Sequence, residues 1–338
     1  MVINKRVTAP IMACLCVSIA VAEVAQAETL RLSSETSDST SRNKGAERFA
    51  ELVEKATDGE KKVKVFANAV LAGGDQLKQA EMVGRGDIDF LLSSAISVSP
   101  LIPEMSVFSL PYLYNNYDEV DATLNGEPAK EMEAIMSDQG LVVLGWGESG
   151  FRELTNSVHP VKTPADLSGL KIRVAGPMFI DILDDLGANP QQIQWTETFS
   201  ALQQGVVDGQ ENPIGAVIIP QRIYEVQDYL TEWHYSYDPA FLAVSKKRWE
   251  SWGEETQATM KQAAEEAMAY QKQLTREQTA EGVDLLKEKG MEIYSPSEEE
   301  LQAFRNATQS AFDTWSQKVG EPLVETFQAN IEQSRQSQ

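Results

Sequence analysis

The sequence predicts an α/β fold divided into two lobes, and three observations support this prediction. Residues 29–33 alternate in polarity as a strand does, residues 46–56 carry apolar side chains at helical spacing, and residues 61–67 alternate again. This β-α-β order is typical of a sheet with helices on its faces. The chain has 338 residues, and the roughly 310 that follow an N-terminal leader are enough for two domains of ordinary size.

The leader has the pattern of a secretory signal peptide. Lys5 and Arg6 give a basic start, residues 7–21 are mainly apolar, and Ala25–Ala27 matches an A-x-A cleavage site. We therefore expect residues 1–27 to be cleaved and the mature protein to be exported.

Two other readings of this segment are less favoured. A membrane anchor would need a longer apolar span than Pro10 and Glu23 allow. Lipid attachment at Cys14 would cut before the apolar run is complete. Cys14 and Cys16 are the two cysteines of the sequence, so the mature chain would have no disulfide, thiol nucleophile or cysteine metal site, which suits a bacterial periplasm.

The chain is strongly acidic, with a formal net charge of -22 at pH 7. Because the leader carries two basic residues and one acidic residue, the mature charge is about -23. This charge disfavours nucleic acid and anionic membrane surfaces as partners. Any site for an anion must therefore be made locally, against the field of the whole protein.

The first lobe continues with further alternating elements. Apolar spacing and a closing glycine predict a helix around residues 77–83, and residues 88–92 form an apolar run typical of a buried strand. A serine-rich loop and an aromatic, proline-rich stretch lead to a helix over about 126–139. A buried strand over 141–147 then delivers the chain to Arg152.

The second half shows the same alternation around one polar segment. Residues 171–174 are predicted to be a short strand, and residues 177–186 and about 199–206 to be amphipathic helices. Residues 205–212 combine glycines with Asp, Gln, Glu and Asn, a composition that predicts a loop between helices. The remaining predictions are a helix from Pro213 to about 222, a crossing strand over 229–237, a core strand over 241–244, one long helix over 254–289, an edge strand over 290–294 and two C-terminal helices.

The familiar enzyme constellations are missing from the sequence. His159 and His234 stand outside any H-E-x-x-H or H-x-H pattern, and the chain has no G-x-S-x-G elbow or P-loop. Gly73-Gly74 lacks the rest of a dinucleotide fingerprint, and the segment 208–211 lacks the spacing of a calcium loop. We therefore predict no catalytic activity, no cofactor and no metal.

Two arginines are the candidate binding residues. Arg173 stands between Ile172 and Val174, so its guanidinium leaves a mostly buried strand, where it is costly to desolvate unless an anion meets it. Such a group can hold a carboxylate through two parallel bonds. Arg152 stands in a similar place. The alternative is that each arginine has a structural partner, for example Asp166 or Asp181 for Arg173, and Glu153 for Arg152.

Two further residues lie near the arginines in this reading. Asn212 can donate an amide to a carboxylate, or merely cap the helix that begins at Pro213. Phe199 can cover a ligand, or pack within its own helix. The spacing of residues leaves both pairs of alternatives open.

The chain resembles the solute-binding proteins of TRAP transporters, the tripartite ATP-independent periplasmic transporters. The resemblance covers nearly all of the mature chain. It is carried by KGAERFAELVEKATDG and GDQLKQAEMVGRGDIDF in the first lobe, and by FRELTNS, PADLSGLKIRV, LGANP, ALQQGVVDGQENP and YEVQDYL in the second. The GLKIRV and GVVDGQENP segments, at this separation, are highly specific.

The resemblance implies a two-lobe periplasmic binding protein of the Venus-flytrap type, with crossing hinge strands and a long helix spanning both lobes. It places lobe I at about 28–149 and 238–277, and lobe II at about 150–237 and 278–338. The family's main carboxylate-binding arginine falls on Arg173. A second arginine falls on Arg152, the amide on Asn212 and a ligand-lining aromatic on Phe199.

The function implied is capture of a small organic acid in the periplasm and its delivery to the TRAP permease, by a protein expected to be a monomer. Polar first-lobe loops at 35–43 and 93–96 favour a C4-dicarboxylate or a sugar acid as the solute. A keto acid, or an ectoine-like zwitterion held by Trp195, Phe199 and Trp233, remains an alternative, as do a secreted sugar-acid enzyme and a sensory partner.

Overall fold

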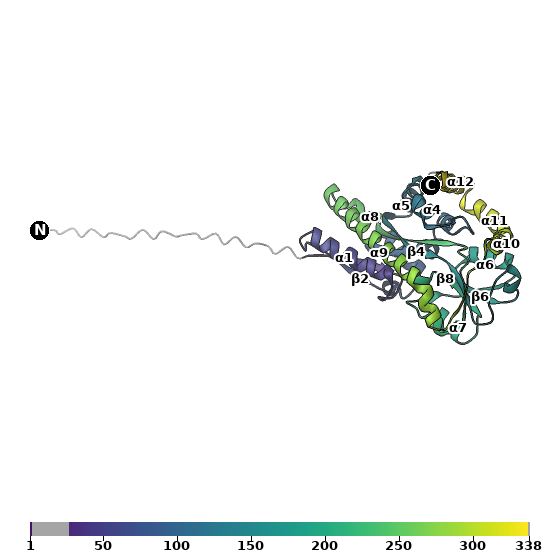
Figure 1. The fold of residues 1–338 in the computed structure, drawn as a ribbon. Coiled ribbons are helices and arrows are strands. Elements are labelled where there is room, and N and C mark those ends of the chain that lie inside the picture. Colours follow the sequence, from purple (N-terminus) through teal and green to yellow (C-terminus); the bar gives the residue numbers. More distant parts are fainter. Residues whose placement is uncertain (2–26, 337–338) are drawn as a thin grey trace.

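The computed structural model describes residue 1 and residues 27–336, which form two mixed β-sheets covered by helices (Figure 1). This confirms the α/β class expected from the sequence. The expected signal peptide, residues 1–27, lies almost wholly outside the described residues, so its cleavage stays a prediction. In the described part of the chain, no helix has both the length and the apolar character needed to cross a bilayer.

The first sheet has five strands in the order β2-β1-β3-β10-β4. β1 pairs in parallel with β2 and β3, whereas β10 runs antiparallel to both β3 and β4. β10, which comes late in the chain, therefore lies between β3 and β4, which come early. The bounds are Glu28–Ser34 for β1, Lys61–Phe66 for β2, Phe90–Ser94 for β3, Leu141–Phe151 for β4 and Tyr237–Ser245 for β10.

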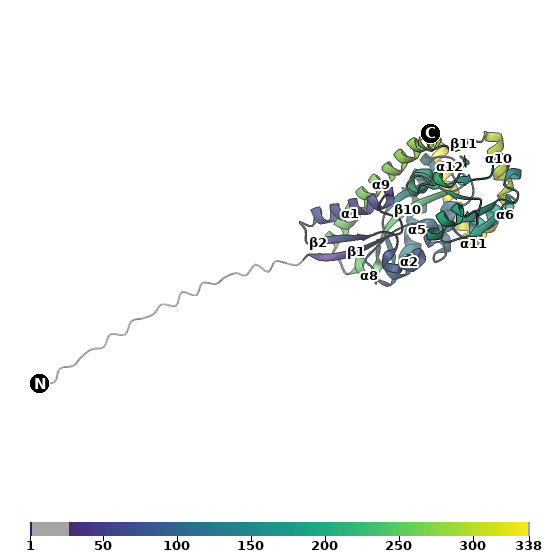
Figure 2. The ribbon, with the colours of Figure 1, turned by 90° about the horizontal axis from the view of Figure 1, so that it is seen from below.

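Different helices cover the two faces of this sheet, because successive side chains of a strand point to opposite sides. Leu92 packs in one apolar cluster with α1 (Ser41–Ala56) and the long helix α9 (Glu254–Glu288). Leu91 packs in another cluster with α2 (Gln76–Arg85). Figure 2 shows α1 and α9 on one side of β1 and β2, with α2 on the other.

Short helices complete this part of the molecule, which we call the first half: the first sheet with the helices packed on it. The second half is the second sheet with its helices. The short helices of the first half are η1 (Val70–Ala72), α3 (Ala95–Val98), η2 (Pro103–Ser109), α4 (Tyr117–Leu124), α5 (Glu127–Asp138) and α8 (Lys246–Glu250).

The second sheet has six strands in the order β11-β9-β5-β8-β6-β7. β8 lies near the middle, antiparallel to β5 and parallel to β6, and β6 is also parallel to β7. The strands are β5 (Glu153–Asn156), β6 (Lys171–Val174), β7 (Asn189–Gln192), β8 (Gly209–Asn212), β9 (Tyr229–Thr231) and β11 (Glu292–Tyr294). The helices of this half are η3 (Pro164–Leu167), α6 (Pro177–Asp185), α7 (Trp195–Gln203), η4 (Ile214–Ile218) and η5 (Ile223–Glu225).

The expectation of a loop over residues 205–212 is wrong for its second part, which is the buried strand β8. Its polar side chains find partners inside the fold: the Gln210 amide donates to the Thr155 hydroxyl at 2.9 Å. Gly209 permits the close approach of β5, since a Cβ there would lie 2.2 Å from the carbonyl oxygen of Thr155. Composition suggested a turn, whereas hydrogen bonding across strands made it a strand.

Two neighbouring expectations also need correction. The helix predicted from Pro213 to about 222 is a five-residue π-helical turn, η4, followed by the short η5. The crossing strand predicted over 229–237 consists of β9 and the first residue of β10, which belong to different sheets. The connection between them is the crossing itself.

The chain passes between the sheets at two adjacent places. β4 ends at Phe151, Arg152 follows, and β5 begins at Glu153 in the other sheet. The return passes from β9 to β10 through Ser236, whose carbonyl accepts a hydrogen bond from the Arg152 amide at 2.9 Å. The two crossing segments are therefore bonded to each other, and Arg152 lies on one of them.

The long helix α9 contacts both halves of the molecule, as the resemblance implied (Figure 1). Its N-terminal part lies along α1 and β4, and its later turns pack against η4. Gly215 of η4 allows this second contact, because a Cβ there would lie 2.7 Å from the Thr275 carbonyl oxygen and from the Thr279 amide.

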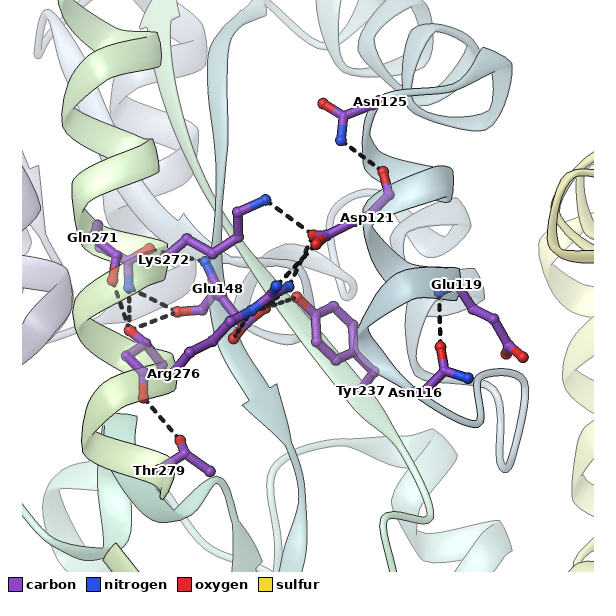
Figure 3. A network of polar contacts seen from close by, with 11 residues as sticks. Asn116, Glu119, Asp121, Asn125, Glu148, Tyr237, Gln271, Lys272, Arg276 and Thr279 are labelled. Carbon is purple, nitrogen blue, oxygen red and sulfur yellow. Dashed lines mark hydrogen bonds and ion pairs between the residues drawn. The ribbon is translucent and has the colours of Figure 1, made fainter. Parts of the chain in front are cut away.

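A polar network fixes α9 to the first half (Figure 3). The Arg276 guanidinium donates to Asp121 of α4 and to Glu148 of β4, each at 2.8 Å. Lys272 reaches the same Asp121 at 3.0 Å, and the Tyr237 hydroxyl of β10 donates to Glu148 at 3.2 Å. One turn of α9 is thereby bonded to α4 and β4, and β10 joins the network through the same Glu148.

The prediction of two C-terminal helices is wrong, because the chain breaks at Thr308 and again at Gly320, where φ is +111°. Three helices, α10 (Glu298–Ala307), α11 (Gln309–Val319) and α12 (Glu321–Gln336), extend across the molecule. α11 contacts α6 of the second half and η2 of the first, and α12 packs on α4 and α5 of the first. The expected lobe boundaries stay a prediction, and these contacts show that the C-terminal helices join the two halves.

Candidate functional site

A cavity lies between the two halves, where β1, β3, β6 and β8 end. Side chains from both sheets line it. The first half contributes Glu35, Thr36, Arg42, Gln76, Ser94, Ile96, Ser97 and Asp238. The second half contributes Arg152, Arg173, Ala175, Trp195, Asn212 and Val217. Ligands of open α/β sheets commonly bind at the carboxyl ends of strands, and this cavity has that position.

Arg173 projects from β6 into the cavity and is only 4% exposed. Its Nε donates to the carbonyl oxygen of Ile193 at 3.0 Å, and its guanidinium lies 5.5 Å from the Trp195 ring centre. Within residues 27–336 no carboxylate lies at ion-pair distance from it, so neither Asp166 nor Asp181 is its partner. Burial lowers the pKa of Arg173 to about 10, which means that its charge is poorly compensated.

Arg152 is buried as deeply, but it has a partner. Its guanidinium forms an ion pair with Glu211 of β8 and also donates to the Glu211 carbonyl oxygen at 2.7 Å. The Tyr235 hydroxyl donates to the same carboxylate at 2.7 Å. Burial would lower the pKa of Arg152, but the Glu211 carboxylate outweighs burial and raises it.

The partner proposed for Arg152 from the sequence, Glu153, is engaged elsewhere. Glu153 accepts from the ring of His234 at 2.9 Å and from its backbone amide at 3.1 Å. Successive residues of an extended chain point in opposite directions, so Glu153 faces away from the guanidinium of Arg152. Glu211, on the strand beside it, holds Arg152 instead.

Asn212 ends β8 and lines the cavity beside the arginines. Its side-chain amide donates to the Gln210 side chain, and Gln210 in turn donates to Thr155. The alternative role as a cap for the following helix is not seen, because Pro213 occupies the position before η4 and no capping bond is formed there. Arg152, Arg173 and Asn212 are therefore brought together on one wall.

Phe199 is not among the residues that line the cavity. It lies on α7 and packs, partly buried, against the apolar cluster that contains Leu202 and Ile214. Trp195, one helical turn earlier on the same face, supplies the aromatic wall instead. Trp233 is fully buried, with its ring centre 4.6 Å from that of Tyr235, so the three-aromatic cage considered from the sequence is not assembled around the cavity.

The wall from the first half carries three charged side chains. Arg42, at the start of α1, forms a buried ion pair with Glu35 and donates to the Ser149 hydroxyl at 3.0 Å. Burial lowers the pKa of Arg42. Asp238 of β10 is 3% exposed and accepts from the Ile96 amide at 3.3 Å. Burial raises the pKa of Asp238, although the nearby arginines oppose this effect.

The loops at 35–43 and 93–96 do contribute to the cavity, as expected, but Arg42 and Asp238 were not singled out from the sequence. Arg42 stands among polar residues that suggested a loop, and Asp238 precedes a proline at the edge of an apolar strand. The available signal for Asp238 was a carboxylate beside a run of buried apolar residues, Phe241 to Val244, where a charge needs a reason.

The chemistry of the cavity is that of anion binding. Three guanidinium groups and two side-chain amides line it, and the described residues contain no group of three or more His, Cys, Asp or Glu side chains that could hold a metal ion. A wider hollow that shares Arg173, Ile96 and Trp195 with it adjoins the cavity and includes Gln192 and Glu197. A small acid can therefore reach the Arg173 guanidinium, which forms no ion pair with a carboxylate of residues 27–336.

Comparisons with known proteins agree over most of the chain. Residues 32–318 match the family described as bacterial extracellular solute-binding protein, family 7. The 2,3-diketo-L-gulonate-binding periplasmic protein YiaO of Escherichia coli is 34% identical over 268 residues, covering 79% of this chain and 81% of that protein.

Solved structures of the same type superimpose closely. A TRAP periplasmic solute-binding protein from Ralstonia eutropha, with bound (S)-2-acetolactate, has a TM-score of 0.87 and 35% identity, covering 90% of this chain and 99% of that one. The sugar acid binding protein DctPAm from Advenella mimigardefordensis, in complex with galactonate, has a TM-score of 0.86 and 31% identity, covering 91% and 99%. The fold, the interlobe cavity and these matches show that the chain belongs to the family of TRAP transporter solute-binding proteins.

Proposed function

We propose that this protein captures a small organic acid in the periplasm and delivers it to a TRAP permease in the membrane. The ligand's carboxylate binds to Arg173, with Arg152 and Asn212 beside it. The protein acts as a monomer and performs no chemical step on the ligand. The names of its relatives support a sugar acid or a related small carboxylate as the solute class.

The observation that carries the proposal is the contrast between the two arginines of the cavity. Arg152 is neutralised by Glu211, whereas Arg173 is equally buried without a carboxylate partner among residues 27–336. Burying an unpaired charge is unfavourable, and an anionic ligand removes the cost. A guanidinium binds a carboxylate through two parallel hydrogen bonds, which fixes the ligand's orientation as well as its charge.

The strength of these contacts is sufficient for physiological capture. Hydrogen bonds to charged groups contribute about 1.5–3 kcal/mol each, and a dissociation constant of ~1 μM corresponds to about 8 kcal/mol. Two bonds from Arg173 with one each from Arg152 and Asn212 reach this range. Arg152 contributes less than Arg173, since Glu211 already engages it.

A calorimetric titration tests the proposal. A thermal-shift screen of dicarboxylates, aldonates, uronates, keto acids and ectoine first selects the ligand, which at about 100 times its dissociation constant stabilises the protein by ~2.7 kcal/mol. We expect Arg173→Ala to abolish binding of the selected acid and Arg152→Ala to weaken it less completely. Arg222→Ala is the matched control, because that arginine is 65% exposed and pairs with Glu225 away from the cavity.

Two results would count against the proposal. Unchanged affinity in Arg173→Ala would remove the anchoring mechanism. Recovery of a chemically altered acid after incubation with the protein would favour the alternative class, a secreted enzyme acting on sugar acids. Delivery to the permease is tested separately, by uptake of the labelled acid in vesicles that contain the permease, with and without this protein.

A further inference from the structure

The two walls of the cavity differ in charge. On the wall from the second sheet, Arg173 presents a cation that no protein carboxylate within residues 27–336 neutralises at ion-pair distance. On the wall from the first sheet, the charge of Arg42 is balanced by Glu35, and Asp238 adds a further carboxylate. The cavity is therefore cationic on one side and has an excess of carboxylate on the other.

Asp238 has hydrogen-bonding capacity left for a ligand. Among the described residues, no Lys, Arg or His lies at ion-pair distance from its carboxylate, and the Ile96 amide donates to one oxygen at 3.3 Å. The Ser149 hydroxyl is a second donor. A carboxyl group accepts more hydrogen bonds than these two donors supply, so this buried group, which lines the cavity, can accept further hydrogen bonds.

Glu35 and Arg42 form a fixed polar surface beside Asp238. One oxygen of Glu35 accepts from Arg42, and the other accepts from the Ser93 hydroxyl at 2.7 Å. The Arg42 guanidinium also donates to Ser149 at 3.0 Å. Because Glu35 occupies Arg42, the first-half wall offers no uncompensated cation to a second anionic group of the ligand.

We propose that Asp238, with Glu35, makes the cavity selective for acids that carry one carboxylate and several hydroxyl groups, and excludes acids with a carboxylate at both ends. Ligand hydroxyls donate to Asp238, whereas a second carboxylate at that wall would meet a like charge in a buried setting. This inference rests on the proposed function, in which Arg173 holds the first carboxylate.

The expected discrimination follows from the strength of such contacts. A hydrogen bond to a buried charged group corresponds to a factor of roughly 10 to 100 in affinity. Repulsion between the second carboxylate and Asp238 acts in the same direction. We therefore expect the hydroxylated monocarboxylate to bind at least about 100-fold more tightly than the matching dicarboxylate.

Matched pairs of acids isolate the second carboxylate. Galactonate and galactarate differ only in whether the sixth carbon is an alcohol or a carboxylate, and erythronate and meso-tartrate differ in the same way at the fourth carbon. Calorimetry on the wild-type protein gives the two affinity ratios without relying on any variant. γ-Aminobutyrate, with an ammonium group at its far end, is included to test whether Asp238 instead receives a cation.

The variant Asp238→Asn tests whether Asp238 causes the difference in affinity between the monocarboxylate and the dicarboxylate. The amide has the same shape without the charge, so the dicarboxylate should gain affinity by about tenfold while the monocarboxylate loses about tenfold. Asp89→Asn is the matched control, since Asp89 is also a buried carboxylate of the first half but pairs with Arg248 outside the cavity. Its affinity ratio should remain that of the wild type.

The outcomes separate this inference from the proposed function. Equal affinity for both members of a pair, an unchanged ratio in Asp238→Asn, or tighter binding of γ-aminobutyrate than of erythronate would each overturn the selectivity, while acid binding through Arg173 would stand. Failure of the wild-type protein to bind any acid would overturn both. A ratio above about 100 that collapses in Asp238→Asn alone would support the inference.

Discussion

Arg173 is buried without a carboxylate partner among residues 27–336, and this should lower the stability of the ligand-free protein. We predict that Arg173→Met makes the ligand-free protein more stable, although it removes the ligand anchor. Burial lowers the pKa of Arg173 to about 10, roughly two to three powers of ten below the ordinary value, and each power of ten corresponds to ~1.4 kcal/mol. The charged form is thus destabilised in the folded protein by about 3 kcal/mol.

The charge of Arg173 destabilises the folded protein at every physiological pH. Arginine is a base, and its pKa is lower in the folded protein than in the unfolded chain, so folding disfavours the protonated form. At pH 7, below both pKa values, the full cost is present. Methionine loses the hydrogen bond to Ile193 and the contact with Trp195, which together contribute about 1–2 kcal/mol, so the net gain should be about 1–2 kcal/mol.

Arg152→Met is the contrasting variant, because it removes a cation that does have a partner. It leaves Glu211, which is fully buried, without its cation, and breaking a buried pair in this way costs about 3–5 kcal/mol. Urea unfolding at pH 7, followed by circular dichroism on ligand-free protein, measures both changes. A lower urea midpoint for Arg173→Met than for the wild type, at equal slope, would refute the reasoning.

Two further predictions concern the crossing segments and the long helix. The Glu153 carboxylate raises the pKa of His234 to about 9, so the stability that this pair contributes is fully present below the ordinary histidine pKa and is lost as pH rises through about 9. The urea midpoint should therefore fall more between pH 6.5 and 9.5 in the wild type than in His234→Asn, and equal falls would contradict this. In Gly215→Ala a methyl group would lie 2.7 Å from backbone atoms of Thr275 and Thr279, so the unfolding free energy should decrease by about 1–3 kcal/mol, whereas an unchanged thermal midpoint would show that η4 can move away from α9.

The elements with strong periodicity were predictable, because their pattern records which side faces the core. The strands around residues 29–33 and 88–92 and the long helix over 254–289 all lie near their expected positions. β8 was missed because every one of its residues is either glycine or polar. Its stability as a strand comes from partners on β5 and β6, and local sequence carries no signal of those partners.

The candidate site shows the same limit. The position of Arg173 in a buried strand could be read from its apolar neighbours, but the partner of Arg152 could not, since Glu211 is 59 residues away and becomes adjacent only when β5 and β8 pair. Phe199 and Trp195 lie on the same face of α7. Trp195, at the start of the helix, lines the cavity and Phe199, one turn later, does not, and this depends on how α7 packs in the fold.

The attachment of α9 to both halves within two turns has a mechanical consequence. Arg276 is bonded to the first half, while Thr275 and Thr279 lie against η4 of the second, so this turn of the helix connects the two halves. At ~1.5 Å per residue, the first residue of α9 lies about 32 Å from Thr275 and the last about 20 Å. The connecting turn therefore divides α9 into a longer N-terminal part and a shorter C-terminal part. Because the longer, N-terminal part packs along α1 and β4, it moves with the first half, and a spin label there paired with one on the second half would report a change in the angle between the halves.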